Sequence, residues 1–305
     1  MKRYIRGLPV AEGVKFATKD RCAIAVRKEN GDIALRVMPA ESFRRFSAVP
    51  FLRGAERLIT GISGLLLAIS QSQDMPAQEM VKPLRLGKMQ LRSYALLAWL
   101  AGIWSVALIA LCLVLTPWLV RIALTQWTTM NANDAGALAC IVRAIMFLPM
   151  VRWLCLMRFV RRLAMHHGAC HKALNCLLSG KALTMENALL CPRLTGRSDA
   201  AFSLAVAFAS LLLCGFVRMD TTFLLGTVVL RLALMLGIAM VLGEICRYAH
   251  RKDGTLCRLI RLPAMALEEL TTLEPHTEML EVALLAMNTA IGKTNSSKNL
   301  RRGIA

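Results

Sequence analysis

The sequence is poor in charged and in aromatic residues for its length. Charged residues occupy 19% and aromatic residues 6% of the 305 positions, whereas a soluble domain carries about 25% charged residues. Glycine and proline are too scattered for a collagen-like or a disordered chain. Hydrophobic residues make up 56%, and the mean hydropathy is +0.51. Because these residues fall in long blocks, we predict an integral membrane protein.

Motifs of common enzyme classes are also absent from the sequence. It contains no Cys-x-x-Cys pair, no phosphate-binding loop, no dinucleotide fingerprint and no serine elbow. The ten cysteines are scattered, and several lie in apolar stretches where cysteine acts as a small hydrophobic residue. We therefore expect no disulfide framework.

Four apolar stretches approach or exceed the roughly 20 residues that a membrane-spanning helix needs. They are residues 94–120, 136–155, 200–217 and 221–246. Lys and Arg number seventeen in residues 1–93, seven in the loop 156–199 and nine after residue 246, but only one in 121–135. The positive-inside rule then predicts a multi-pass protein of the bacterial inner membrane, with both termini and the central loop in the cytoplasm.

We predict a mainly α membrane protein with four transmembrane helices, a re-entrant or interfacial helix and a small cytoplasmic β-hairpin region. The hairpin is expected in residues 1–49, because Asn30-Gly31 separates two alternating apolar runs. Residues 50–70 form a helix too short to span, and 71–93 form a linker. The membrane domain covers 94–246, with its cytoplasmic loop at 156–199.

The remaining residues, 247–305, are predicted to be cytoplasmic. They contain two short amphipathic helices separated at Pro275, followed by a disordered tail. The acidic side chains of these helices could dock on the basic N-terminal region or on another protein.

The charges suggest partners and one buried pair. A net charge of +19 is better explained by membrane lipid and topology than by nucleic acid, which we expect only through a ribosome. Arg152 and Glu244 lie at similar depths of two predicted spans, so we expect them to pair. Arg231 lies near mid-span, and a transporter could use such charges. Four spans without inverted repeats do not favour that alternative.

Several motifs resemble, in order along the chain, those of the YqhQ-like family of bacterial multi-pass membrane proteins. The matching blocks are Glu12-Gly13-Val14, Pro50-Phe51-Leu52-Arg53-Gly54, His167-Gly-Ala-Cys170-His171-Lys172, Leu183-Thr-Met-Glu186-Asn187-Ala188 and Glu274-Pro275. The resemblance implies a membrane fold and a family of predicted metal-dependent enzymes without a settled activity. It also implies a glutamate, a histidine and a cysteine at three positions where this chain has Cys170, Thr195 and Ser198.

His167, Cys170 and His171 are the candidate metal ligands. Their i, i+3, i+4 spacing places them within one helical turn, and two imidazoles with a thiolate could hold zinc. The alternative is that the histidines are basic residues at the cytoplasmic end of a helix and Cys170 packs in a core.

The substitution of the glutamate removes the expected general base. We therefore predict a non-catalytic scaffold or regulator that binds a protein partner at the cytoplasmic face. Two alternatives stay open: a metal-dependent membrane hydrolase that uses the His-Gly-Ala-Cys-His segment, and an accessory factor facing the ribosome or the translocon.

Overall fold

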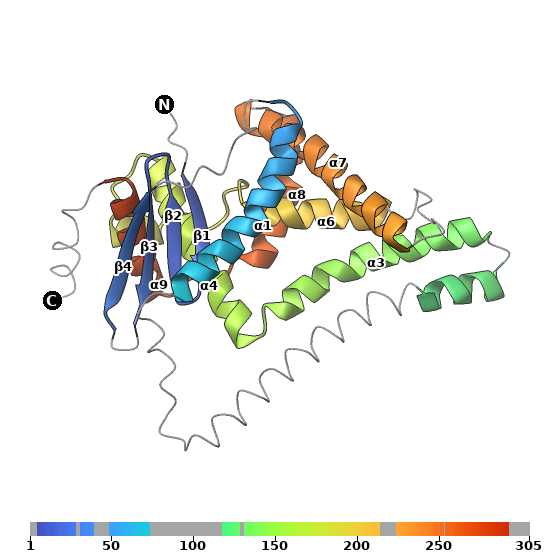
Figure 1. Ribbon diagram of the computed structural model, residues 1–305, viewed down its shortest axis with the longest axis horizontal. Coiled ribbons are helices and arrows are strands. Elements are labelled where there is room, and N and C mark those ends of the chain that lie inside the picture. Colours follow the sequence, from blue (N-terminus) through green and yellow to red (C-terminus); the bar gives the residue numbers. More distant parts are fainter. Residues whose placement is uncertain are drawn as a thin grey trace, which may run out of the picture. The chain divides into compact units, whose positions relative to one another are not determined.

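A computed structural model describes residues 5–28, 31–39, 49–73, 118–128, 131–213, 224–252 and 254–292 (Figure 1). The chain forms two compact units. The first comprises Met1–Met80, Leu154–Ser203 and Met240–Ala305, and the second comprises Val81–Trp153 and Leu204–Ala239.

The first unit contains a four-stranded antiparallel sheet in the order β1-β2-β3-β4. Its strands are β1 (Arg6–Val10), β2 (Gly13–Ala17), β3 (Arg21–Arg27) and β4 (Ile33–Pro39). The hairpin predicted around Asn30-Gly31 is confirmed, because β3 pairs with β4 from Arg27↔Ile33 to Arg21↔Pro39. Gly31 has φ +86°, the conformation that such turns require.

A second hairpin, joining β1 to β2, was not predicted. Only Ala11 and Glu12 connect the two strands, and Glu12 has a left-handed φ of 55°. The following residue, Gly13, lies so close to β3 that a Cβ atom there would be 2.2 Å from the Ala25 carbonyl oxygen. The turn lacks the usual Asn-Gly signal, so the sequence pattern did not reveal it.

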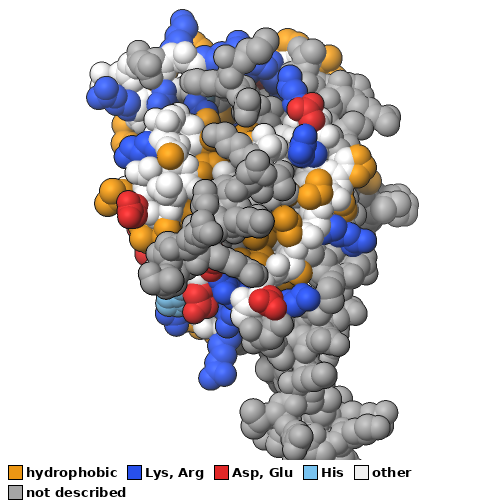
Figure 2. All heavy atoms as spheres, turned by 90° about the vertical axis from the view of Figure 1, so that its left-hand side faces the viewer, with side chains coloured by type: hydrophobic (Ala, Val, Ile, Leu, Met, Phe, Trp, Pro, Cys, Tyr) orange, Lys and Arg blue, Asp and Glu red, His pale blue; other side chains and the backbone are white. Residues whose placement is uncertain are grey.

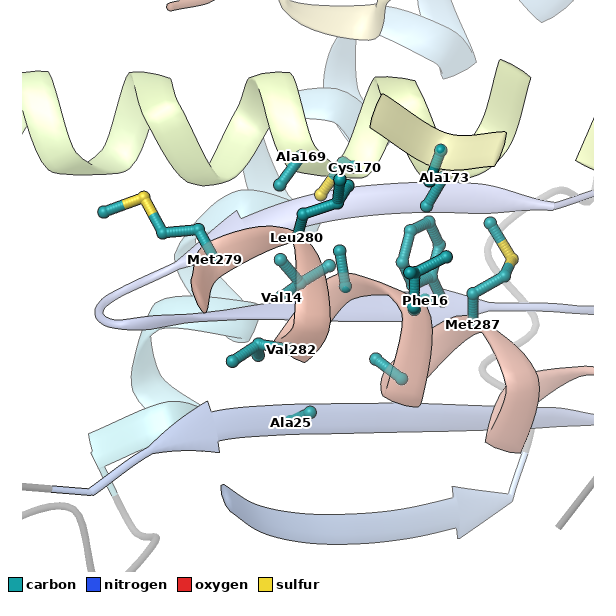
Figure 3. Close-up of a cluster of buried hydrophobic side chains, with 14 of the residues drawn as sticks. Val14, Phe16, Ala25, Ala169, Cys170, Ala173, Met279, Leu280, Val282 and Met287 are labelled. Atoms are coloured by element: carbon teal, nitrogen blue, oxygen red, sulfur yellow. The ribbon is translucent and has the colours of Figure 1, made fainter. Parts of the chain in front are cut away.

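One face of the sheet forms the main core with α4 (Arg158–Leu178) and α9 (Thr277–Ala290). Figure 3 shows side chains of β2, β3, α4 and α9 meeting there, including Val14, Phe16, Ala25, Leu280 and Met287. Ten of the fourteen residues of α9 are buried. This helix is thus a core element that is buried over most of its length, whereas the sequence predicted a short amphipathic helix with one apolar side.

Helix α9 docks on the N-terminal region. This was one of the two alternatives for its acidic side chains, the other being another protein. The Glu281 carboxylate pairs with Arg27 at the end of β3. The Arg27 guanidinium also donates to the Glu278 carbonyl oxygen at 3.0 Å. The break at Pro275 is confirmed too: α8 (Thr255–Thr271) ends four residues before it, and α9 begins two residues after it.

Of the other helices of the first unit, α4 and the short α5 (Met185–Leu189) lie in a predicted loop, and α1 (Leu52–Gln73) lies on a predicted helix. The predicted loop 156–199 contains α4 and α5, and α5 packs on α9. Helix α1 covers the segment predicted as 50–70 and contacts β1. The linker predicted at 71–93 lies outside the described residues beyond Gln73.

Two helices are long and apolar enough to cross a membrane, not the predicted four, among the residues that the structure describes. They are residues Asp134–Leu154 of α3 (Ala132–Leu154) and Val228–Arg251 of α7 (Leu224–Arg251). The described part of α6 (Asp199–Leu213) has 15 residues, which span only about 22 Å as an α-helix. The first predicted span lies mostly outside the described residues, which resume at 118.

Candidate functional site

A buried carboxylate, that of Glu268 in α8, lies at the centre of a polar network in the first unit. Its side chain is fully buried. It accepts hydrogen bonds from the Thr195 amide (3.0 Å), the Thr195 hydroxyl (2.7 Å) and the Gly196 amide (2.6 Å), and it pairs with His171. These donors compensate the cost of burying a charge. Burial by itself raises the pKa of Glu268, but the bonds from His171 and Thr195 outweigh it and lower the pKa.

The imidazole of His171 links this carboxylate to the loop before α6. Its Nδ1 atom lies 3.0 Å from the Arg193 carbonyl oxygen and also contacts Glu268. Both neighbours are acceptors, so Nδ1 carries the proton. One histidine thereby holds α4, α8 and the loop together.

The imidazole of His167, one turn earlier in α4, has a different environment. Its Nδ1 lies 3.3 Å from the Thr271 carbonyl oxygen, and its Nε2 lies 3.5 Å from the Ser198 hydroxyl. Burial, followed by the neighbouring His171, lowers the pKa of His167 to about 3. The ring is therefore neutral at physiological pH, donates to Thr271 through Nδ1 and accepts from Ser198 through Nε2.

The Ser198–His167 pair resembles a nucleophile and its base, but it is poorly suited to catalysis. Ser198 is only 6% exposed, and its hydroxyl also accepts from the Ala201 amide at 3.3 Å, as a helix cap does. A general base works best with a pKa near the working pH. An imidazole with a pKa of about 3 is too weak a base for that role.

The third predicted ligand, Cys170, faces a different neighbour of α4 than the two histidines do. Figure 3 shows its side chain in the hydrophobic core, between Ala169 and Ala173 and above the sheet. Burial raises the pKa of its thiol, which therefore stays protonated. Positions i+3 and i+4 of a helix point about 100° apart, so α4 directs Cys170 to the sheet and His171 to the loop.

The predicted zinc set is thus divided between two environments. No group of three or more His, Cys, Asp or Glu side chains could hold a metal ion within the described residues. The nitrogen and oxygen atoms of the network bind each other, and the thiol is neither deprotonated nor close to them. The residues do not fit the predicted three-ligand zinc site.

The Glu244 carboxylate has a partner that the sequence analysis did not consider. Both carboxylate oxygens bind the guanidinium of Arg53 in α1, and one accepts from the Phe51 amide at 2.8 Å. Phe51 has a left-handed φ of 64°, which brings its amide to Glu244. Arg53 is thus a partner of Glu244 from outside the apolar spans, and because Arg152 belongs to the second unit, the Arg152–Glu244 pairing stays a prediction.

A third cluster, which the sequence analysis missed, surrounds Asp199 at the start of α6. Its carboxylate binds Arg6 of β1 at 2.9 Å and Arg57 of α1 at 2.7 Å. Arg6 also donates to the Thr60 carbonyl, and Arg57 donates to the Ser198 carbonyl. These basic residues were counted only as topology signals. Their partners are up to 193 positions away in sequence, and no local spacing reveals such pairs.

The remaining family-motif residues also make contacts within the first unit. Glu12 binds Arg162 of α4, and Glu274 binds Lys172. Asn187 donates to the Ala182 carbonyl at 3.1 Å and so closes the turn before α5, where Glu186 lies in the first helical turn. Pro275 lies near Gly168, whose absent side chain lets the Leu273 carbonyl approach α4.

Comparisons with known proteins agree with these motifs. A family model described as "Protein of unknown function (DUF1385)" matches residues 49–293. The chain is 25% identical over 291 residues to the uncharacterized protein YqhQ of Bacillus subtilis (strain 168), covering 92% of this chain and 90% of that protein. No solved structure matches the chain. The protein therefore belongs to the DUF1385 family and is a YqhQ-like protein.

Proposed function

We propose that this protein is a membrane-anchored, non-catalytic scaffold or regulator whose first unit binds a protein partner in the cytoplasm. The observation that carries the proposal is the closed network around Glu268. Its carboxylate is fully buried and is occupied by donors of the protein itself. Polar groups that satisfy each other stabilise a fold, whereas a catalytic group must be free to bind its substrate.

The anchoring part of the proposal draws support from α3 and α7. Large apolar side chains are exposed on both helices, among them Ile145 at 60% and Val229 at 57%. Such exposure is unfavourable in water and favourable in lipid. Figure 2 shows Lys and Arg side chains scattered over the visible face with fewer Asp and Glu among them, and the net charge of +19 suits a protein at an anionic cytoplasmic surface.

Purification of the tagged full-length protein from membranes tests this function. We expect a co-purifying protein in a fixed ratio that persists between about 50 mM and about 200 mM salt. Ribosome contacts would weaken steeply over that range, so a salt-sensitive complex rich in RNA would favour the accessory-factor alternative.

The catalytic alternative is tested with two variants of the same network. Ser198→Ala removes the hydroxyl next to His167, and Arg193→Gln changes a partly exposed side chain of the same loop as a control. A scaffold should keep its partner in both variants in proportion to its membrane abundance. The third measurement is whether each variant restores the phenotype of a strain from which the gene is deleted. A Ser198→Ala protein that is present at normal abundance but does not restore it, while Arg193→Gln does, would contradict the non-catalytic role.

A further inference from the structure

Helix α8 exposes an apolar stripe next to the end of a candidate membrane helix. Leu256, Leu259 and Leu262 are 63%, 62% and 57% exposed. Their spacing of three residues keeps them on one side of the helix. Cys257 and Glu268 of the same helix are buried. The stripe is therefore the outer surface of a helix whose other side is held by the first unit.

Basic residues flank this stripe. Arg251, Lys252 and Arg258 are exposed, and residues 255–267 include no acidic residue. An exposed leucine stripe bordered by Lys and Arg is typical of a helix that lies in the interface of a bilayer with anionic lipids. The leucines enter the acyl region, and the long basic side chains reach the headgroups.

The position of α8 relative to the end of α7 agrees with this arrangement. The candidate membrane helix ends at Arg251, and α8 begins at Thr255. Arg261 of α8 donates to the carbonyls of Ala249 at 2.7 Å and Lys252 at 2.8 Å, which ties the two helix ends together. A helix held at the end of a membrane span lies at the height of the headgroups.

We infer that the first two turns of α8 bind the surface of an anionic bilayer, with Leu256, Leu259 and Leu262 in the acyl region and Arg258 and Lys252 at the headgroups. The inference depends on the anchoring part of the proposed function and not on the scaffold role. An anionic bilayer accounts for both features at once, because its acyl region accepts the leucines and its headgroups bind the flanking basic side chains. A protein partner would need an apolar groove and an acidic border in the same arrangement.

The test uses the full-length protein in vesicles, with an environment-sensitive fluorescent amino acid at position 259. Position 190 is the control, because Leu190 is 79% exposed in the same unit but lies after the short helix α5 and not on α8. One set of vesicles is phosphatidylcholine, and the other contains phosphatidylglycerol in addition. Quenchers attached to lipid chains report insertion, and iodide reports exposure to water.

We expect lipid quenching at position 259 that is severalfold stronger than at position 190, and iodide quenching in the opposite order. Lipid quenching at 259 should rise when phosphatidylglycerol is present, and the double change Lys252→Gln and Arg258→Gln should remove that rise. Iodide quenching at 259 as strong as at 190 would overturn the inference. So would shielding from both quenchers, because a protein would then cover the stripe.

Equal lipid quenching in both vesicles would overturn the requirement for anionic lipid. Extraction of the same vesicles with carbonate separates this result from a failure of the proposed function. A protein released by carbonate is not membrane-anchored. A protein that stays in the membrane but has a water-exposed position 259 is anchored without the contribution of α8.

Discussion

At the residue scale, the Glu268 carboxylate carries a negative charge in the interior of the first unit, 72 positions from the Gly196 amide that it binds. Its donors come from α4 and from the loop before α6, so the charge connects three segments that are distant in sequence. The loss of one partner in such a network leaves other groups without hydrogen bonds, which costs more than the bond itself.

Glu268→Gln should therefore lower the free energy of unfolding by about 2–4 kcal/mol, because the amide presents a donor to the donors that now bind the carboxylate. The control is Glu269→Gln, one position further in α8. Glu269 is exposed and pairs with Arg193 at 3.2 Å, so its change should cost less than about 1 kcal/mol. Thermal unfolding in detergent measures both variants, and equal effects would contradict the role of the network.

His167 should make the protein sensitive to mild acid. Its pKa of about 3 in the fold lies below the ordinary histidine value of 6.5, so the unfolded state takes up the proton first as the pH falls. The stability that depends on neutral His167 is complete above pH 6.5 and declines toward pH 3. At pH 4.5 the loss amounts to about 3 kcal/mol.

The variant His167→Gln isolates this contribution, because glutamine stays neutral over the whole range. The difference in unfolding temperature between pH 7 and pH 4.5 should be smaller in the variant than in the original protein. Two parallel pH profiles would show that other groups cause the acid sensitivity.

Cys170 should be inert as a ligand and important for packing. Its thiol is buried among apolar side chains, so Cys170→Ser places a hydroxyl there and should cost about 1–3 kcal/mol. We expect substoichiometric zinc in the purified protein by elemental analysis, with the same content in this variant. Near-equimolar zinc that disappears in Cys170→Ser would restore the metalloenzyme alternative.

At the scale of the elements, two glycines allow α1 and α7 to cross at close range within the first unit. A Cβ atom on Gly243 would lie 2.6 Å from the Cα atom of Gly54, which is too close for any side chain. The ion pair of Arg53 with Glu244 lies beside this crossing. The Pro-Phe-Leu-Arg-Gly motif thus contributes a salt bridge and a close packing contact at adjacent positions.

Gly243→Ala should separate the two helices and destabilise the protein by at least about 2 kcal/mol. The new Cβ atom would meet the Cα and amide nitrogen of Gly54, and backbone atoms cannot turn aside as a flexible side chain can. Gly237→Ala is the matched control in α7, since nothing lies within 4 Å of a Cβ atom there. Alanine favours a helix over glycine by about 1 kcal/mol, so the control should be neutral or more stable. Comparable losses in both variants would argue against the crossing.

At the scale of the whole molecule, the charge asymmetry still predicts the orientation in the membrane. A cysteine replacing Asn131 should react with a membrane-impermeant reagent from outside the cell, because the segment around it carries one basic residue. A cysteine replacing Asn30 should react only after the membrane is permeabilised. The opposite pattern would overturn the predicted topology.

The sequence by itself determined those features that depend on neighbouring residues. Asn30-Gly31 predicted a hairpin because a tight turn requires particular backbone conformations, and Pro275 predicted a helix break because proline removes a backbone donor and disfavours a helix interior. Pro149 and Pro263 nevertheless lie inside α3 and α8, so this local preference does not decide every case. Apolar blocks predicted α3 and α7 as candidate membrane helices for the same reason: composition and length are local properties.

Only the tertiary structure decided which distant groups meet. The spacing of His167, Cys170 and His171 suggested one site, but the sheet packs on the side of α4 that carries Cys170, and the loop packs on the side that carries the histidines. Glu268 was one acid of an amphipathic segment until the fold buried it beside Thr195. Helical spacing defines which residues share a turn, whereas burial and partners depend on what packs against each side.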